Sequence, residues 1–379
     1  KGDPHHARQH ERFTMTNPIL MKPLLGFLTP WIIYLIITLL HYVLPGKWVQ
    51  GYVRDSKTGE LLKYRLNGIW VLLVSLGLWF LCGYMNWVPF DWLYEVRWYS
   101  LAGAFVMGIL YTLMVVLPYP STGGPLLSDL YLGRLENPQY IKGRIDAKMW
   151  LYLVGAVMLE LHVASSFAHQ YQKFGDLSSP GFFFSSLMLT WFVFDYLTFE
   201  RVHLYTYDIF AEKVGFKLGW GCLVFYPYFY AIPLWSTADL QGSGTPSWLL
   251  WISVAIFFLG WSLARGANMQ KFYFKTDPAR SFLGIRPETI SDGQQTLLVN
   301  GFWGLSRHVN YLGEILMGTG IALAVSFHGS WLPWLYPIYY IALLFPRERD
   351  DDKRCAAKYG DLWTQYTDRV KYRIIPFIY

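Results

Sequence analysis

Nine stretches of mainly apolar residues, each close to the length of a bilayer-crossing helix, constrain this chain more than any other feature. A spanning helix needs about 20 such residues. The stretches lie at 24–44, 68–88, 98–118, 147–168, 181–199, 216–235, 247–264, 311–327 and 331–346. No soluble domain separates them. The sequence therefore predicts an all-α polytopic membrane protein of nine spans, or ten if a weaker pattern in 281–306 or in the C-terminal tail hides another.

The composition agrees with this class. Of the 379 residues, 54% are apolar and 15% are charged, whereas about 25% are charged in an ordinary soluble domain. Three cysteines in no C-x-x-C arrangement indicate neither a disulfide framework nor a structural zinc site. Residues 1–18 lack the apolar core of a cleavable signal peptide.

Lysine and arginine alternate between loops, and this pattern predicts the orientation. The loops 45–67, 119–148, 200–217, 265–310 and 347–379 hold 5, 4, 3, 6 and 8 of them, and the intervening loops hold 1, 1, 0 and 0. The C-terminus and the 265–310 segment are therefore expected in the cytosol. The N-terminus is expected outside for nine spans, or inside for ten.

Several motifs of common enzymes are absent. The chain has no G-x-G-x-x-G before a helix and no G-x-x-x-x-G-K-[ST], so it contains neither a Rossmann fingerprint nor a P-loop. The nine histidines form no H-E-x-x-H and none of the histidine boxes of membrane di-iron enzymes. G-x-S-x-G is also missing, so serine-hydrolase chemistry has no support. We expect no metal and no nucleic acid as partners.

Ionisable residues at membrane depth are costly and indicate candidate functional sites. They are Glu160 and His162 in the fourth span, Asp195 and Glu200 at the end of the fifth, and Glu314 at the start of the eighth. We interpret Glu160 and His162 as a satisfied buried polar pair. Asp195 and Glu200 lie beside the turn 205–208, which could be a helix cap or the polar end of a substrate pocket.

The cytosolic segments 265–310 and 347–379 mix Arg and Lys with Trp, Tyr, Asn and Asp. Such a mixture can simply form a solvated face with the expected positive charge. It can also hold a planar, multiply anionic ligand, because arginine forks match phosphate groups and aromatic side chains stack on rings.

Motifs in these segments and upstream resemble one enzyme family. They are LLVNGFWGLSRHVNYLGE (297–314), RCAAKYGDLWTQY (354–366), YRIIPFIY (372–379), and the patterns formed by Gly59, Leu62, Tyr64, Asn67 and Gly68, by Ala267, Asn268, Gln270, Lys271, Phe274 and Lys275, and by Thr206, Asp208, Ile209, Gly215 and Phe216. Their order over residues 45–379 resembles the sterol reductase family. That family includes the Δ14-, Δ7- and Δ24(28)-sterol reductases and the membrane part of the lamin B receptor.

The resemblance implies a ten-span membrane enzyme that reduces a double bond of a sterol intermediate with NADPH. It also implies a cofactor pocket built from the last spans and the adjoining cytosolic segments. Carried over to this chain, the cofactor-binding residues are Lys271, Lys275, Trp303, Arg307, His308, Asn310, Tyr311, Arg347, Asp351, Cys355, Tyr359 and Tyr366. Residues 24–235 would form the N-terminal part and part of the sterol pocket, and 236–379 the NADPH pocket, after a polar segment 1–23.

The chain departs from the family pattern before Cys355. Relatives usually have H-R-x-x-R-D-E-x-x-C, whereas Pro346 replaces the His and Asp350 the second Arg. Arg349 could take the place of that arginine from one position away. We interpret four aromatics near the last span as interfacial or lipid-facing residues, namely Trp331, Trp334, Tyr336 and Tyr339.

The expected chemistry needs a proton donor. An isolated sterol alkene is not electrophilic enough to accept a hydride directly, so protonation to a tertiary carbocation would come first. A donor must be within hydrogen-bond reach of the alkene, and burial that raises a carboxyl pKa would suit it. The candidates are Tyr311, Asp351, Tyr207 and Glu200, followed by Tyr366. On a helix, Arg307, His308 and Tyr311 share one face.

Other functions stay open at this point. The C14–C15 bond is preferred because Asn310–Gly313 and the 376–379 end look most like the Δ14 branch, including its bacterial members. A Δ7-sterol reductase is the nearest alternative. A membrane methyltransferase that uses S-adenosylmethionine shares the R-H-x-N-Y signature, and a sterol-binding receptor without turnover is a third reading. The expected partners are a sterol and the lipid bilayer, in either a bacterial inner membrane or the endoplasmic reticulum.

Overall fold

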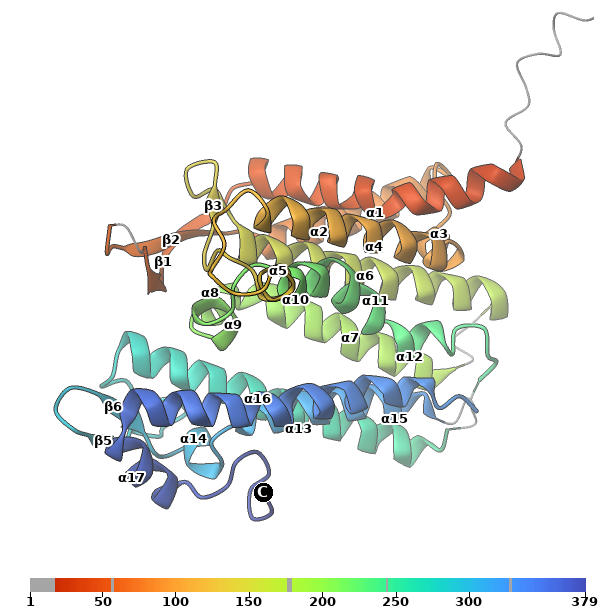
Figure 1. Ribbon diagram of the computed structural model, residues 1–379. Coiled ribbons are helices and arrows are strands. Elements are labelled where there is room, and N and C mark those ends of the chain that lie inside the picture. The colour runs from red at the N-terminus through yellow and green to blue at the C-terminus, as the bar shows by residue number, and fades with distance from the viewer. Residues whose placement is uncertain (1–17, 56–57, 176–178, 243–244, 327–328) are drawn as a thin grey trace, which may run out of the picture.

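The computed structural model describes residues 18–55, 58–175, 179–242, 245–326 and 329–379. It is mostly helical and adds three short antiparallel hairpins, so the predicted helical class is confirmed (Figure 1). Residues 1–17 of the expected polar segment 1–23 lie outside the described residues.

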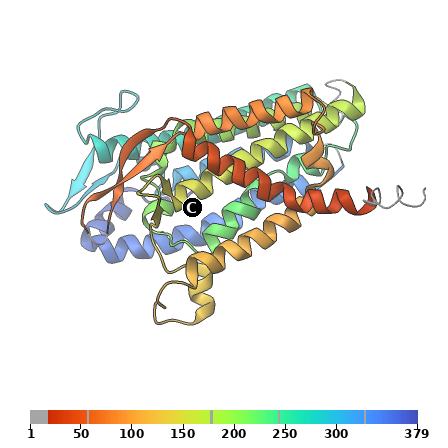
Figure 2. The same ribbon diagram turned by 90° about the horizontal axis from the view of Figure 1, so that it is seen from above.

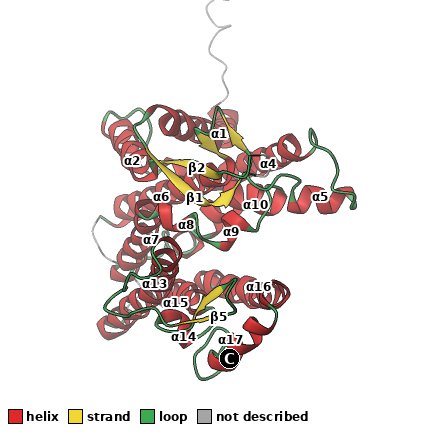
Figure 3. Ribbon diagram, turned by 90° about the vertical axis from the view of Figure 1, so that its left-hand side faces the viewer, coloured by secondary structure: helices red, strands yellow, loops and turns green. Residues whose placement is uncertain are grey.

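The long N-terminal helices form one group, which is the upper group when the molecule is viewed along the helices (Figure 3). They are α1 (Pro18–Val43), α2 (Gly68–Tyr84), α4 (Arg97–Val116), α6 (Ala147–Phe174) and α7 (Pro180–Thr198). α6 is the most deeply buried of them. It begins at Asp146, whose carboxylate accepts hydrogen bonds of 3.1 Å from the backbone N–H groups of Lys148 and Met149.

The C-terminal helices form a second group against α7. They are α13 (Ser247–Thr276), α15 (Val309–Ala324) and α16 (Leu335–Tyr359). Glycines let α13 and α15 approach closely. A Cβ on Gly313 would lie 2.5 Å from the backbone nitrogen of Ala264, and one on Gly260 would lie 2.5 Å from the carbonyl oxygen of Gly313. Small residues at such a crossing are typical of helix pairs in membranes.

Among the residues that the structure describes, five helices are long and apolar enough to cross a membrane: α1 from Met21, α4, α6, α7 and α13. They support the prediction of a membrane protein. α2 and α15 are apolar but shorter, and the second half of α16 is polar. The predicted span 311–327 is helical as far as Ala324, where α15 ends. Residue 327 lies outside the described residues.

The predicted span 216–235 is helical but irregular. It contains α10 (Phe216–Trp220), a π turn (Gly221–Phe225), α11 (Tyr226–Phe229) and α12 (Ile232–Trp235). Pro227 and Pro233 each lie in the first turn of a short helix, where the missing backbone N–H of proline is tolerated. The junction residues Gly221, Tyr226 and Tyr230 are themselves in the α-helical region, so the predicted stretch is helical over most of its length, with a π turn within it.

Shorter elements gather at the two ends of the bundle, as Figures 1 and 2 both show. One end carries the strand pairs β1 (Lys47–Arg54) with β2 (Leu61–Leu66), β3 (Gln139–Tyr140) with β4 (Ile145–Asp146) and β5 (Thr289–Ser291) with β6 (Thr296–Leu298), and the helices α8 (Glu200–His203), α9 (Tyr207–Phe210), α14 (Phe302–Leu305) and α17 (Asp361–Arg369). The opposite end carries α3 (Trp92–Glu95), α12 and the 3₁₀ turn Leu332–Trp334. α5 (Leu126–Leu132) packs against α4 and α10.

The additional tenth span expected in 281–306 or in the tail is not found in either segment. The first holds the β5–β6 hairpin and the four-residue α14, and the tail holds the nine-residue α17. Both helices are far below the roughly 20 residues that cross a bilayer.

The interpretation of Glu160 and His162 as a satisfied pair is wrong. Both side chains are buried, and Glu160 accepts a 2.8 Å hydrogen bond from Thr190. Neither ring nitrogen of His162 has a hydrogen-bond partner in the described part of the chain. Residues two apart on a helix point in different directions, so the two side chains do not face each other.

Candidate active site

A large cavity lies between the two groups of helices. Its volume is about 1160 Å³, and its walls come from α6, α7, the irregular segment 216–235, α13, α15 and α16, with α9, α14, α17 and the β5–β6 hairpin at one end. The cavity therefore runs from the end that carries the hairpins into the apolar interior of the bundle.

Cationic side chains line the hairpin end of the cavity. They are Lys271 and Lys275 on α13, Arg307 before α15, and Arg347, Arg354 and Lys358 on α16. The Nζ atom of Lys271 lies 5.1 Å from the ring centroid of Trp303, and that of Lys275 lies 3.8 Å from the ring of Tyr52 on β1. These cation–π contacts hold the ammonium groups beside aromatic faces.

Aromatic rings form a row in the same region. Tyr359 and Trp363 stack with centroids 6.2 Å apart, and Trp363 and Tyr366 stack at 4.9 Å. The Tyr366 hydroxyl donates to the carbonyl of Trp303 at 3.3 Å, and the Trp303 indole donates to the carbonyl of Ala267 at 2.8 Å. The row is thus fixed to both α14 and α13.

The C-terminal segment holds Arg307 and His308 in place. Their backbone N–H groups donate to the carbonyls of Tyr372 and Arg373 at 2.9 and 2.8 Å. The Arg307 guanidinium donates to the Asp352 carboxylate at 2.7 Å. Burial, with a further contribution from Lys271 and Arg307, lowers the pKa of His308 to about 3. The imidazole of His308 is therefore neutral at physiological pH.

Tyr207 of α9 lies beside two guanidinium groups of α16. The centre of the Arg347 guanidinium is 4.5 Å from the Tyr207 ring centroid, and that of Arg354 is 4.8 Å away. Arg354 Nη1 donates to the Tyr207 hydroxyl at 2.6 Å, and Arg347 forms an ion pair with the neighbouring Asp208. These contacts fasten α9 to α16 across the cavity.

Asp351 and Cys355 follow on the cavity side of α16. Burial raises the pKa of the Asp351 carboxyl above its usual value, although Lys271 opposes the shift. The Nε2 atom of His308 lies 3.8 Å from the Asp351 carboxylate. Burial also raises the pKa of the Cys355 thiol to about 12, so it is not a reactive thiolate.

The inner part of the cavity is largely apolar. Its lining residues include Phe192, Tyr230, Trp261, Met317 and Leu343. Asp195 and Arg265 also line it, and Arg265 donates three hydrogen bonds to the Asp195 carboxylate, so these two charges are paired with each other.

Some buried polar atoms of the lining residues have no hydrogen-bond partner within the described ranges. They are Arg265 Nη1, Arg307 Nε, Arg347 Nε and Asn310 Oδ1. Leaving a buried donor or acceptor unpaired costs about 1–3 kcal/mol. A bound polar ligand or water would recover this free energy.

The cavity brings together every residue that the family resemblance assigned to the cofactor, from Lys271 to Tyr366. The candidate proton donors Tyr207, Tyr311 and Asp351 line it as well. Glu200 does not. Its carboxylate accepts a 2.9 Å hydrogen bond from the backbone N–H of Gly68 at the start of α2, and this position does not fit a proton donor to a ligand in the cavity.

Two other interpretations need correction. Tyr336 is buried in the core and Tyr339 lines the cavity, so neither faces lipid, whereas Trp331 is exposed. Arg349 is exposed and does not line the cavity. Arg354 of the same helix, although also exposed, does line the cavity.

The sequence analysis missed several lining residues, namely Tyr52, Phe210, Asn268, Arg354, Lys358 and Trp363. Helical spacing from Arg347 could have found Arg354 and Lys358, because positions 347, 351, 354, 355 and 358 share one face of a helix. No local signal marks Tyr52, which lies in a hairpin more than two hundred residues away from Lys275.

Comparison with known proteins decides the family. Residues 9–379 match the family described as "Ergosterol biosynthesis ERG4/ERG24 family". The chain belongs to this family. The match covers nearly the whole sequence, so the resemblance inferred from the motifs is confirmed, and the protein is an oxidoreductase of the sterol reductase family.

Curated members of the ERG4/ERG24 family are similar over most of their length. The Delta(14)-sterol reductase of Arabidopsis thaliana is 30% identical over 348 residues, which are 89% of this chain and 91% of that protein. The Delta(14)-sterol reductase of Methylotuvimicrobium alcaliphilum is 32% identical over 88% of this chain and 79% of its own. The Delta(14)-sterol reductase erg24 of Schizosaccharomyces pombe is 31% identical over 97% and 89%.

Proposed function

We propose that this protein reduces the C14–C15 double bond of a sterol intermediate, with NADPH as the reductant. The observation that carries the proposal is one continuous cavity with a cationic, aromatic end and an apolar end. Its volume of about 1160 Å³ exceeds the range of about 300–1,000 Å³ that is typical for one small ligand. The names of the relatives supply the bond, because each is a Delta(14)-sterol reductase.

The hairpin end fits NADPH. Arginine forks and lysine ammonium groups bind phosphates, and the row Tyr359, Trp363 and Tyr366 offers faces for planar rings. The unpaired atoms Arg307 Nε and Arg347 Nε would gain partners. NADPH, when bound, would supply a hydride to the cationic carbon that protonation of the alkene leaves. The residues that would hold it are those assigned by the family resemblance, together with Arg354, Lys358 and Trp363.

The apolar end fits a fused ring system without charge. Phe192, Trp261 and Met317 offer carbon surfaces there, and burying apolar area contributes roughly 25 cal/mol per Å². The same lining keeps water away from the reacting carbons. A carbocation formed by protonation would otherwise be captured by water, so exclusion of water is part of the chemistry.

Tyr207 is our choice of proton donor. Its oxygen accepts a hydrogen bond from Arg354 at 2.6 Å, so its own hydrogen is free to be donated. Two guanidinium groups lie within 5 Å of the ring centroid, at 4.5 and 4.8 Å, so positive charge is already in place beside the group that would give up the proton in the transition state. Asp351 and Tyr311 also line the cavity, but neither accepts a hydrogen bond from a guanidinium group in the described structure.

We also propose the arrangement in the membrane. Residues 24–235 supply the N-terminal wall of the sterol pocket, and residues 236–379 supply most of the NADPH pocket. The lysine and arginine pattern favours the hairpin end and the C-terminus on the cytosolic side, where NADPH is available.

Product analysis tests the function. Purified protein in detergent is incubated with NADPH and, separately, with a Δ14, a Δ7 and a Δ24(28) sterol, and the products are analysed by mass spectrometry. We expect loss of one double bond from the Δ14 sterol only, and no product without NADPH. Tyr207→Phe should lower turnover by about 10²–10⁴-fold, the usual contribution of a general acid, and Asp351→Asn by much less.

Other outcomes would overturn parts of the proposal. Reduction of the Δ7 sterol alone would change the bond but keep the reductase. NADPH and sterol binding without any reduction would favour a receptor, and methyl transfer from S-adenosylmethionine would favour a methyltransferase. A larger loss for Asp351→Asn than for Tyr207→Phe would assign the proton to Asp351.

A further inference from the structure

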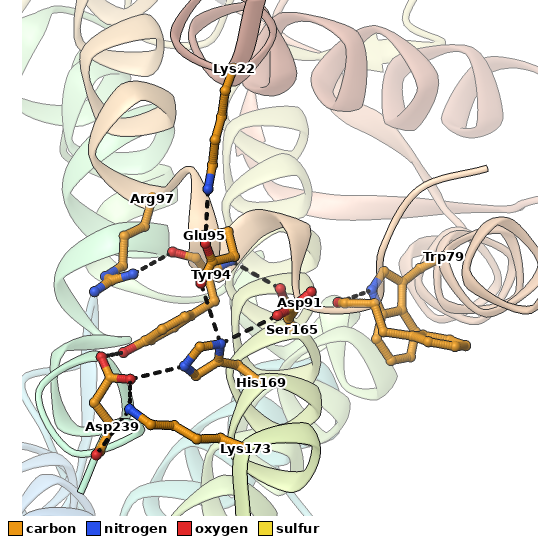
Figure 4. Close-up of polar contacts among 11 residues, drawn as sticks. Lys22, Trp79, Asp91, Tyr94, Glu95, Arg97, Ser165, His169, Lys173 and Asp239 are labelled. Atoms are coloured by element: carbon orange, nitrogen blue, oxygen red, sulfur yellow. Dashed lines mark hydrogen bonds and ion pairs between the residues drawn. The ribbon is translucent and has the colours of Figure 1, made fainter. Parts of the chain in front are cut away.

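Two groups of ionisable side chains lie away from the cationic end of the cavity. One joins Asp91 and Glu95 of α3 to His169 of α6 and Asp239 after α12, at the opposite end of the bundle (Figures 1 and 4). The ring nitrogens of His169 lie 3.3 Å from Asp91 and 3.0 Å from Asp239, so this group supplies its own partners. The second group lines the inner part of the cavity, and the reduction proposed above gives it no role.

Glu314 of α15 belongs to this second group. It lines the cavity and is partly exposed to it. Its carboxyl group interacts electrostatically with Arg265 of α13 and Asp195 of α7, and Tyr340 of α16 is its hydrogen-bonding neighbour. Within the described residues Glu314 forms no ion pair, since Arg265 donates its hydrogen bonds to Asp195. A carboxyl group at membrane depth is costly and indicates a function. We call these four residues the inner polar group.

Unpaired atoms beside Glu314 indicate what kind of ligand would fit. Arg265 Nη1, Trp261 Nε1 and the Tyr226 hydroxyl are buried in the cavity lining, and none of them has a hydrogen-bond partner in the part of the chain that the structure describes. Trp261 lies one turn before Arg265, so the two side chains share a face of α13. Arginine and tryptophan nitrogens only donate, whereas a carboxyl group offers acceptor oxygens. A ligand here must therefore both accept and donate.

A hydroxyl group matches this requirement, because it has one donor hydrogen and two acceptor lone pairs. An ammonium group has no acceptor and a carboxylate has no donor, so neither would match both sides. Arg265 and Glu314 are near each other without forming an ion pair. One hydroxyl with a hydrogen bond of about 2.8 Å to each side can bridge such a gap. The surrounding wall, which includes Phe192, Met317 and Leu343, is apolar.

The position of the inner polar group fits the shape of a sterol. Lining residues of α16 extend from Tyr340 to Lys358, which is about 27 Å along a helix. Arg347, which contacts the proposed proton donor Tyr207, is about 10 Å along the helix from Tyr340, close to the length of four fused sterol rings. Ring A carries the hydroxyl, and ring D, at the other end, contains the C14–C15 bond. A hydroxyl at the inner polar group therefore places that bond towards Tyr207.

We infer that the inner polar group binds the 3-hydroxyl of the sterol, with Glu314 accepting its hydrogen and Arg265 Nη1 donating to its oxygen. The inference rests on the proposed function, since it requires a sterol in the cavity. Asp195 orients the guanidinium of Arg265. The site selects free sterols, because a 3-ketone has no hydrogen to donate and a 3-ester adds bulk where the wall is closed by Tyr340. It contributes to affinity and orientation and takes no part in proton or hydride transfer.

Competition between paired sterols tests this site on the full chain in detergent. A Δ14 sterol with its 3-hydroxyl and the 3-deoxy analogue each displace a tritiated Δ14 sterol, with NADP⁺ present so that no reduction occurs. The parent should bind the hydroxyl form roughly 10- to 100-fold more tightly, as expected for a hydrogen bond that involves a charged group. In Glu314→Met this preference should fall by at least about 5-fold, a coupling of the size that groups in contact show.

The matched control is Glu160→Met. Glu160 is another buried glutamate at membrane depth, but it does not line the cavity, so its loss should leave the hydroxyl preference as in the parent. Glu314→Gln keeps an acceptor oxygen and should retain part of the preference. A measurement on the parent alone covers the case in which Glu314→Met does not fold. A sterol with a photoreactive diazirine in ring A should label peptides that contain Glu314 or Tyr340, and not those of α17.

Because these experiments measure binding, their failure is distinct from failure of the proposed function. A retained hydroxyl preference without reduction of any sterol would overturn the reaction and keep the hydroxyl site. Equal affinity of the parent for both sterols, or an equal preference in the parent and in Glu314→Met, would refute the hydroxyl site and leave the reduction standing. Labelling of α17 by the ring-A diazirine would also refute it, since the hydroxyl would then lie at the cationic end.

Discussion

The guanidinium of Arg354 donates a 2.6 Å hydrogen bond to the hydroxyl of Tyr207, and so connects α16 to α9 across the cavity. The two residues are 147 positions apart in the chain. Arg347 lies beside the same ring and pairs with Asp208. Arg347 and Arg354 of α16, which also line the cationic end of the cavity, therefore both contact the phenol that we propose as the proton donor.

Loss of this hydrogen bond should slow the reaction. Arg354→Met keeps most of the side-chain volume and removes the charge. Because hydrogen bonds to charged groups contribute about 1.5–3 kcal/mol, we expect kcat to fall roughly 10- to 100-fold. Steady-state kinetics with a Δ14 sterol measures this change. In a Tyr207→Phe background the same substitution should have little further effect, since coupled residues are not additive.

The matched control for Arg354→Met is Arg349→Met. Arg349 lies on the same helix but is exposed and outside the cavity, so its loss should leave kcat and KM within about twofold, as is usual for surface substitutions. Equal losses in the two variants would mean that the general positive charge of α16 matters and the contact with Tyr207 does not.

Lys275 should affect NADPH binding more than turnover. Its ammonium group lies 3.8 Å from the ring centroid of Tyr52 and lines the cationic end of the cavity. Lys275→Met removes one positive charge that we propose contacts a phosphate of NADPH. It should raise KM for NADPH by roughly 10-fold, which is a loss of about 1.4 kcal/mol of binding free energy, with kcat nearly unchanged. The increase should shrink at high salt. Lys353→Met, an exposed position on α16, is the control.

Cys355 should resist alkylation. Burial raises the pKa of its thiol to about 12, and only the thiolate reacts with iodoacetamide. We expect labelling of the native protein at pH 7.5 to be slower than that of a free cysteine by roughly 100-fold or more. Mass spectrometry of the Cys355 peptide measures the rate, and the unfolded protein provides the reference. Rapid labelling with loss of activity would indicate an accessible, activated thiol.

Glu200 should make stability depend on pH. Burial raises the pKa of its carboxyl to about 7 from 4.5. The folded protein thus keeps a proton that the unfolded chain releases, and stability falls as pH rises from about 4.5 to about 7. Melting temperatures between pH 4.5 and 8 should therefore slope less steeply downward in Glu200→Gln than in the parent. Glu60→Gln should keep the parental slope.

Close packing of α13 and α15 should not tolerate a methyl group at Gly313. The added Cβ would lie 2.5 Å from backbone atoms of Ala264 and Gly260, which cannot move away as a side chain would. We expect Gly313→Ala to destabilise the protein by at least about 1–3 kcal/mol and to lower activity, because Tyr311 lies two residues before this crossing. Gly77→Ala on α2 has open space around its Cβ and should be nearly neutral in thermal unfolding.

The sequence by itself determined the membrane class and the family. Long apolar stretches cannot remain in water, and they predicted long helices such as α1, α4, α6, α7 and α13 within a few residues. The motifs around Arg307 and Cys355 were specific enough to indicate the family and the residues that line the cationic end of the cavity. These inferences depend on local composition and on order along the chain, which the sequence states directly.

The tertiary structure decided the rest. The sequence of 216–235 did not indicate the π turn at Gly221–Phe225, which packs against α4 and α6. The sequence offers Glu200 as a candidate proton donor, whereas the structure places its carboxylate outside the lining of the cavity, where it accepts a hydrogen bond from the backbone N–H of Gly68. The partners of Tyr207 and His169 come from segments about 70 to 150 residues away. Such contacts are set by how helices cross, and helix crossing depends on packing across the whole bundle, which no local pattern encodes.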